Sequence, residues 1–302
     1  MADAPDDFDA VLADLERGLK LIEDRAPGYV LARDMYEGKA AEVVTSPALQ
    51  RIINATAQRH PLSFAHIPVD AVLDKVNLVG ITADGDAQQR LADLFDELDL
   101  DDEADEWHLK AGYFGDYYVI VDPLEEDEAT GAAVALTAAG SSPLSTVVVY
   151  SSKDERTPLF GVKRWQEGTG QAKRWRACVY YDDVTVLLIG REGGGDTAPK
   201  AADFMPDLDE DGTEGSERVP HEGGRMLVVH YAVGGKPYGV PLHRKAFGAQ
   251  DAITKISATN LASVDGQGFA SRWALADPMA DIDDDIDADG LLARATELGI
   301  PL

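Results

Sequence analysis

The stretch YGVPLHRKAFGAQDAITKISATNLASVDGQGFASRWAL, residues 238–275, indicates the fold more directly than any other part of the chain. Larger apolar and amide side chains recur in it at three- and four-residue steps, and small side chains fill most other positions. This pattern predicts a helix from about His243 to Val264, roughly 33 Å long at about 1.5 Å per residue, which Gly266 and Gly268 bring to an end. Such a helix can pack closely on several sides, in an assembly of copies or as a buried helix of a monomer. The residues expected to meet neighbours are Ala252, Ile253, Ile256, Ala258, Leu261 and Ala262.

The composition is that of a folded chain with an acidic surface. Of its 302 residues, 45% are apolar, which is enough for a core in one large or two smaller domains. The net charge of −28 comes mainly from five segments, residues 3–16, 84–106, 122–128, 196–218 and 277–290. Tight nonspecific binding of DNA is not expected, because it depends on neutralisation of phosphates by Lys and Arg. DNA could still slide past such a surface, and solubility or a salt-tolerant host would also explain the charge.

Membrane insertion, secretion and cysteine chemistry are not expected. No segment has the roughly 18 consecutive apolar residues of a membrane helix, and the acidic N-terminus MADAPDDFDA lacks the basic character of a signal peptide. The single Cys178 cannot form an internal disulfide and does not suggest a cysteine-ligated metal.

Local patterns predict a chain that is rich in helix at first and in strand later. An amphipathic helix is expected over 6–24, and further helices over about 46–59, after Ile67-Pro68, over 86–98 and over 101–115. Strands are expected at 78–82, 116–121, 145–151, 159–166, 173–181, 184–190 and 225–233, most of them in an antiparallel sheet of hairpins. Residues 191–224, rich in Gly, Asp and Pro, are expected to form a long flexible acidic loop. The predicted fold class is α+β.

No catalytic signature is present. The sequence lacks GxSxG and HExxH, and the glycines of GREGGGDTAPK (190–200) lack the Lys-Ser/Thr pair that would bind a phosphate. We expect no enzyme activity and no cofactor, and an unrecognised small hydrolase is a minor alternative.

Two acidic loops partly match a calcium-binding pattern. DLDEDG (207–212) and DIDADG (285–290) place carboxylates at positions 1, 3 and 5 before a Gly. The candidate calcium ligands are Asp207, Asp209, Asp211, Asp285, Asp287 and Asp289. The bidentate Glu of position 12 is replaced by Arg218 in the first loop and Thr296 in the second. Solvated loops without metal are therefore the main interpretation, and a calcium-stabilised protein-binding module is the alternative.

A Lys-Arg-Trp triplet occurs twice in this acidic chain. If two hairpin strands bring the copies together, they could form a small basic, aromatic patch. Such a patch could contact phosphate and stack on a base or sugar, or pair with acidic loops of a neighbouring subunit, which is the preferred interpretation. The residues are Lys163, Arg164, Trp165, Lys173, Arg174 and Trp175.

Several motifs, taken in chain order, resemble those of the portal proteins of tailed double-stranded-DNA bacteriophages, of the siphophage type common among actinobacterial viruses. The motifs are MYEGK (35–39), IPVDAVLDKVNLVGIT (67–82), LFDELDLDDEADEWHLKAGYFGDYYVIVD (94–122), LFGVKRW (159–165) and the stretch 238–275. Tyr-Glu-Gly replaces the usual Tyr-Tyr-x-Gly of the family, and Pro241 stands where Ser and Glu are common.

The resemblance implies a portal-type wing domain, with helices around an antiparallel sheet region, followed by a long stem helix. The corresponding divisions are an N-terminal amphipathic helix at 1–28, a wing-like domain at 29–237, a stem-like helix at 238–265 and a clip-like or acidic tail region at 266–302. Portals of this type continue beyond the stem helix into a clip, a second stem helix, a tunnel loop and a crown. The chain is therefore expected to be a truncated or shortened relative.

In function, the resemblance implies a structural ring, typically a dodecamer, at one vertex of the virion capsid. The ring would be made in the host cytoplasm and would conduct double-stranded DNA during packaging and ejection, in transient contact with it. The implied partners are other copies of the chain, the terminase large subunit, the major capsid and scaffolding proteins and a head-tail adaptor. No membrane partner is implied.

Overall fold

The computed structural model describes residues 4–39, 63–76, 78–85, 87–126, 133–169, 173–190, 197–221, 224–235 and 237–268. The chain divides into two compact units, Met1–Ala258 and Thr259–Leu302. Among the described residues, every strand and most of the helices belong to the first unit.

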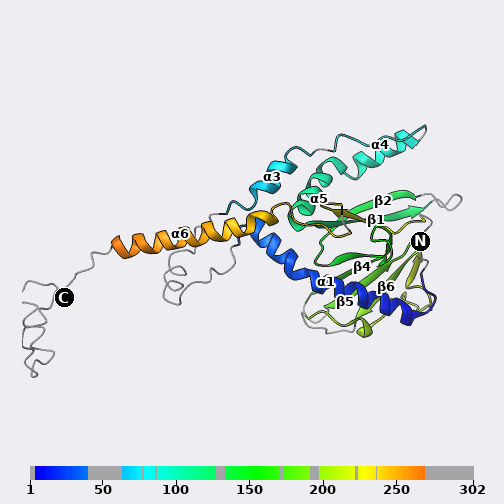
Figure 1. Cartoon of the computed structure of the whole chain (residues 1–302). Coiled ribbons are helices and arrows are strands. Elements are labelled where there is room, and N and C mark those ends of the chain that lie inside the picture. Colours follow the sequence, from blue (N-terminus) through cyan, green and yellow to red (C-terminus); the bar gives the residue numbers. More distant parts are fainter. Residues whose placement is uncertain are drawn as a thin grey trace, which may run out of the picture. The chain divides into compact units, whose positions relative to one another are not determined.

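Most helices lie near the predicted segments (Figure 1), but the helix predicted from His243 to Val264 instead spans Phe247–Gly268 and continues through Gly266. The α-helices of the described residues are α1 (Phe8–Tyr36), α3 (Ile67–Leu73), α4 (Ala87–Glu97), α5 (Leu100–Phe114) and α6 (Phe247–Gly268). Short 3-10 helices lie at Ala201–Asp203 (η2) and Arg244–Ala246 (η3). The predicted helices near 67, over 86–98 and over 101–115 are confirmed, while the one predicted over 46–59 lies outside the described residues.

Helix α1 is longer than the sequence indicates. It begins after Asp7, whose side chain accepts a hydrogen bond from the Asp9 amide at 3.2 Å, and it continues through Pro27. A proline inside a helix removes one backbone hydrogen bond and commonly ends the helix. Here the helix continues because the turns after Pro27 bury Tyr29, Ala32 and Met35.

The strands pair antiparallel, as predicted. They form two sheets, however, and not the single sheet that the sequence indicated. The first sheet has the order β2-β1-β9 and the second β3-β4-β5-β6-β7, with β8 also paired to β6. The bounds are β1 (Asp116–Glu126), β2 (Ala133–Ser141), β3 (Thr146–Tyr150), β4 (Pro158–Glu167), β5 (Arg174–Tyr180), β6 (Val184–Gly190), β7 (Phe204–Pro206), β8 (Arg218–Pro220) and β9 (Val228–Ala232). The α+β fold class is confirmed.

Two segments differ from the sequence interpretation. Residues 191–224, expected to be a long flexible loop, contain η2, β7 and β8 in their described part, and both strands pair with β6. Strands of three residues are too short to produce a detectable alternation. Conversely, the strand expected at 78–82 is not paired with any strand of the described part of the chain.

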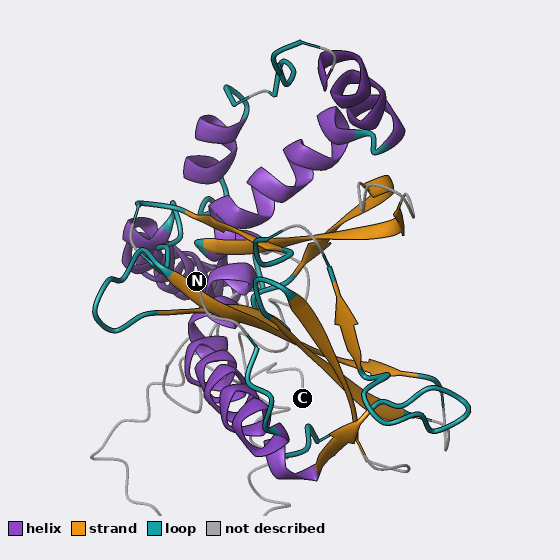
Figure 2. Ribbon diagram, turned by 90° about the vertical axis from the view of Figure 1, so that its right-hand side faces the viewer, coloured by secondary structure: helices purple, strands orange, loops and turns teal. Residues whose placement is uncertain are grey.

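Alternation along the strands divides the core into layers (Figure 2). On β1, Tyr117 and Val119 face α5, whereas Tyr118 and Ile120 belong to a cluster with Val148 of the second sheet. Residues of opposite parity on the second sheet pack against α1. The order of layers is therefore α5, first sheet, second sheet, α1. None of the described helices is long and apolar enough to cross a membrane.

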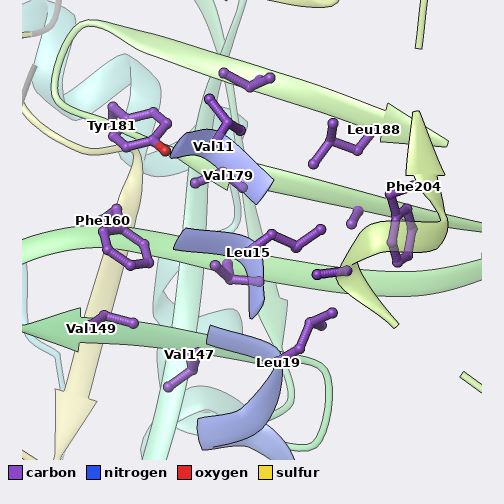
Figure 3. Packing of buried hydrophobic residues seen from close by; sticks show 14 of the residues in the cluster. Val11, Leu15, Leu19, Val147, Val149, Phe160, Val179, Tyr181, Leu188 and Phe204 are labelled. Carbon is purple, nitrogen blue, oxygen red and sulfur yellow. The ribbon is translucent and has the colours of Figure 1, made fainter. Parts of the chain in front are cut away.

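The largest cluster lies between α1 and the second sheet (Figure 3). Val11, Leu15 and Leu19 of the helix point onto the sheet. The sheet contributes Val147, Val149, Phe160, Val162, Ala177, Val179, Val186 and Leu188. Gly18 allows the close approach, because a Cβ atom added there would lie 2.4 Å from a methyl carbon of Val162.

This contact predicts opposite effects for two Gly→Ala changes in one helix. Gly28→Ala meets nothing within 4 Å and should raise the free energy of unfolding by about 0.5–1 kcal/mol, because alanine is the better helix former. Gly18→Ala should lower it by about 1–3 kcal/mol through overpacking against Val162. Urea unfolding followed by circular dichroism would measure both, and equal stabilisation by the two changes would contradict the close contact. Combining Gly18→Ala with Val162→Ala should recover part of the loss.

Candidate assembly helix and its buried anchor

Helix α6 contains all six residues predicted to meet neighbouring copies. In the first unit, Ala252 is exposed, Ile253 is half-buried and the Ile256 side chain is 61% exposed. Ala258, Leu261 and Ala262 also lie within the bounds of α6. An exposed isoleucine on a helix of small residues is compatible with a protein contact, and the interface role of the six residues remains a prediction.

The segment before α6, residues 237–246, is held by backbone and side-chain contacts and is called the pre-α6 segment. The Val240 amide donates to the Val233 carbonyl at 3.1 Å, and the Leu242 amide donates to the Gly112 carbonyl at 3.0 Å. His243 is fully buried, and its Nε2 is 2.9 Å from the Ala32 carbonyl of α1. The helix therefore starts from a fixed position on α1 and α5.

A buried carboxylate connects this segment to the rest of the unit. Asp116, the first residue of β1, is 0% exposed. Its Oδ2 accepts hydrogen bonds from the Arg25 guanidinium at 2.8 Å and the Tyr29 hydroxyl at 2.6 Å. Its Oδ1 is 2.9 Å from Nε2 of His230 and accepts a bond from the Gly239 amide at 2.5 Å. We call these five residues the Asp116 junction, which joins α1, β1, β9 and the pre-α6 segment.

The junction determines the protonation pattern of its histidine. An ionised carboxylate can only accept hydrogen bonds, so His230 carries a proton on Nε2. Its Nδ1 lies 2.7 Å from the hydroxyl of Tyr150 on β3, which donates to it when the ring is neutral. Tyr238 adds a second link to β3, because its hydroxyl donates to the Val148 carbonyl at 2.9 Å and its ring lies under the Arg25 guanidinium at 4.4 Å.

The electrostatics of the junction favour the ionised carboxylate. Burial alone would raise the pKa of Asp116, but hydrogen bonds from His230, Tyr29 and Gly239 hold that pKa below its usual value. Burial and the neighbouring Asp116 charge raise the pKa of Tyr29, so its hydroxyl remains a donor. Because the folded-state pKa of Asp116 is depressed, its contribution to stability is present above the unfolded value, about 3.9, and is lost as pH falls through the folded value.

Two glycines allow the backbone to approach at the same place. Gly115 ends α5 with a φ of 93°, a conformation that residues with a side chain rarely adopt. A Cβ atom added at Gly239 would lie 1.9 Å from the carbonyl oxygen of Gly115. The hydrogen bond from Gly239 to Asp116 therefore depends on the absence of a side chain at residue 239.

The first acidic loop has other partners for two of its predicted calcium ligands. Asp207 forms an ion pair with Arg176 of β5. Asp209 accepts a hydrogen bond from the Thr213 amide at 2.7 Å, while Asp211 is exposed. Within the described ranges, no group of three or more His, Cys, Asp or Glu side chains could hold a metal. Asp285, Asp287 and Asp289 lie outside the described residues.

The two Lys-Arg-Trp copies lie near each other at neighbouring strands, but they do not form one patch. Trp165 pairs with Arg176 and Trp175 pairs with Gln166, so the two tryptophans face opposite sides of the sheet. Lys163 lies 5.5 Å from the Trp165 ring, toward the first sheet. Arg164 pairs with Glu23 of α1 at 3.0 Å. Lys173 and Arg174 continue the second copy at the start of β5, where Arg174 pairs with Glu167 in the register. A contact of these residues with DNA or a neighbouring subunit remains a prediction.

Sequence reasoning did not identify the Asp116 junction. Arg25 and Tyr29 are separated from Asp116 by about ninety residues and His230 by more than a hundred. The available signal was one acidic residue between a helix-ending glycine and the apolar run Tyr117–Val121. A charged residue at the start of a buried strand is uncommon unless it is paired.

Removal of the Asp116 carboxylate should cause a large loss of stability. Asp116→Ala would leave four buried or half-buried donors without an acceptor and should lower the free energy of unfolding by about 3–5 kcal/mol. Asp24→Ala on the exposed face of α1 is the matched control, and it should change stability by no more than about 0.5 kcal/mol. Urea unfolding at neutral pH measures both. Similar midpoints for the two variants would rule out a central role for Asp116.

Comparison with known proteins identifies the family. The sequence profile described as "Phage portal protein, SPP1 Gp6-like" matches residues 23–283 of the 302-residue chain. A search of the curated proteins found no match. The match covers α1 from Glu23 onward, both sheets, the Asp116 junction and α6, and it agrees with the resemblance seen in the motifs. The chain belongs to the SPP1 Gp6-like family of phage portal proteins, which are structural proteins and not enzymes.

Proposed function

We propose that the protein is the structural portal of a tailed phage, a ring at one capsid vertex through which double-stranded DNA is packaged and ejected. The family match over residues 23–283 carries this proposal. The ring would be a dodecamer in the virion, assembled after synthesis in the host cytoplasm. Its partners would be the terminase large subunit, the major capsid and scaffolding proteins and a head-tail adaptor.

In this proposal residues 29–237 form the wing and α6 is the stem helix. The small side chains of α6 suit close packing of one copy against the next. The pre-α6 segment would give every copy the same starting position for this helix, since Gly239 and His243 are fixed to buried groups of the body. A ring needs this uniformity, because each subunit must present the same two surfaces to its neighbours.

The net charge supports a conduit better than a DNA-binding surface. An acidic wall repels the phosphate backbone and lets DNA move, whereas tight binding would require many Lys and Arg contacts. At −28 per copy, the repulsion between subunits must be overcome by apolar or uncharged contacts. Contacts along α6 are the first candidates, and transient contacts of the Lys-Arg-Trp residues with DNA or a neighbour are secondary.

Substitutions in α6 and in the acidic loops should affect assembly differently. Ala258→Trp should overpack the helix contact at a cost of about 1–3 kcal/mol in every subunit, so that ring formation fails while the fold is retained. The control is Asp209→Asn combined with Asp287→Asn, which removes two loop charges and should leave rings intact. Size exclusion and negative-stain imaging report assembly, and circular dichroism reports folding.

Two outcomes would contradict the proposal at different levels. If the Ala258→Trp protein still forms rings while the loop variant does not, the interface between copies lies elsewhere than on α6. A wild-type protein that stays monomeric at high concentration and is absent from virions would overturn the portal function itself.

A further inference from the structure

Residues 78–83, LVGITA, have the composition of a strand but no strand partner. Val79 is 95% exposed and Ile81 is 39% exposed. Among the described residues, the amides of Leu78 to Thr82 donate no hydrogen bond, and only the Ala83 amide has an acceptor, the Gln88 side chain. Gly80 has a φ of 145°, so the segment bends there in the isolated chain. β-prone residues with free amides commonly pair with a strand from another chain.

The surroundings of this segment are also unusually apolar. Thirteen large apolar residues of the described part are exposed, and six of them lie between residues 64 and 81. These six are Phe64, Ile67, Val72, Val76, Val79 and Ile81. A concentration of exposed apolar side chains on a protein surface marks a protein contact. We call residues 64–83 the apolar segment; it contains α3 and leads to α4 (Figure 1).

Strand β2 offers the edge with which such a segment could pair. It is an outer strand of the first sheet and, at nine residues, the longest edge strand in the described part of the chain. No backbone group on its outer edge has a hydrogen-bonding partner among the described residues. Proteins normally protect such edges with charges, prolines or bulges. The whole stretch 129–152 contains no charged residue.

The other edges are shorter or already occupied. On β3, the Val148 carbonyl accepts from Tyr238 and the Tyr150 carbonyl accepts from Arg17. β7 and β8 have three residues each, and β9 has five.

Residues 78–83 and strand β2 are also alike in having no charged side chains. Residues 76–83 carry no charge, and neither does β2, although 82 of the 302 residues are charged, 55 of them acidic. Two copies with a net charge of −28 repel each other over most of their surfaces. Uncharged edges that can form a ladder are places where this repulsion is weakest and hydrogen bonds are gained.

We propose that residues 78–83 of one copy add as a strand to the outer edge of β2 of the neighbouring copy. Donor and acceptor are different surfaces, so the contact is heterologous and can be repeated around a closed ring. The inference rests on the proposed portal function, because the partner is a second copy in the ring. It adds a contact in the first unit to the contacts expected along α6.

A proline substitution separates strand addition from folding. Val79→Pro and Thr82→Pro each remove an amide that makes no hydrogen bond among the described residues of the isolated chain, so the melting temperature of the monomer should not change. Consecutive amides of a strand point to opposite sides, so one of these two variants removes a ladder donor and should lower the association constant between copies by about tenfold or more. Val79→Thr is the matched control, since it keeps the amide and a β-branched side chain and should assemble nearly as wild type. Analytical ultracentrifugation measures association, and calorimetry measures the melting temperature.

Cross-linking then tests the identity of the acceptor. In a Cys178→Ala background, Val79→Cys and the exposed Ala139→Cys of β2 would be joined by a short bis-maleimide, which tolerates a register error of one residue pair. A ladder of covalent oligomers that needs both cysteines is the expected result. Asp24→Cys replaces Val79→Cys in the control and should give no ladder.

The outcomes distinguish the inference from the function on which it rests. If wild-type rings form but Val79→Pro and Thr82→Pro both assemble as well as Val79→Thr, or the cysteine pair gives no ladder, strand addition is wrong and the portal function stands. Cross-linking between two Val79→Cys residues alone would replace β2 by a symmetric contact between apolar segments and would also overturn the proposal. If the wild-type protein forms no ring, both the function and the inference fail.

Discussion

The arrangement of the first unit depends on one buried carboxylate. Asp116 is fully enclosed, and its two oxygens accept from four groups that come from α1, β9 and the pre-α6 segment. A buried charge without partners is strongly destabilising, so these groups must be in place together for the chain to fold. Helix α1 and the first sheet are thereby linked to the start of α6. The hydrogen bond from the Gly239 amide to Asp116 fixes the segment that leads into α6, the helix proposed for assembly.

Close backbone approach accompanies this junction and explains where glycine is required. Gly239 lies against the Gly115 carbonyl, and Gly18 lets α1 rest on Val162. Both contacts reduce the distance between layers at points where polar or apolar groups must meet. The first allows a backbone amide to reach a carboxylate, and the second lets α1 bury Val11, Leu15 and Leu19 on the second sheet. The spacing of these elements therefore depends on glycines at a few contact points as well as on the burial of apolar side chains.

The sequence predicted elements whose signals are local and missed those that depend on distant partners. The runs over β3, β4, β5 and β6 are long, β-branched and bounded by turns, and each was predicted close to its observed bounds. Helix α1 extends past Pro27 because of burial against α5, which no local pattern reports. β7 and β8 are strands only because β6 lies beside them. The Asp116 junction combines residues from opposite ends of the first unit, so only the tertiary fold could show it. The candidate residues of α6 were found from small side chains and helical spacing, but which of them meet another copy depends on an assembly that one chain does not contain.

The most direct test of this account is the exchange rate of the Gly239 amide hydrogen in the folded protein at neutral pH. If Asp116 fixes the pre-α6 segment, this amide should exchange as slowly as those of Tyr118 and Ile120 in β1, because only a large opening of the first unit would expose it. Residue-resolved hydrogen exchange by NMR or by mass spectrometry would compare these sites. Exchange at the rate of the exposed turn at Gly234, with β1 still protected, would show that the start of α6 is not held by the buried carboxylate and would contradict the account.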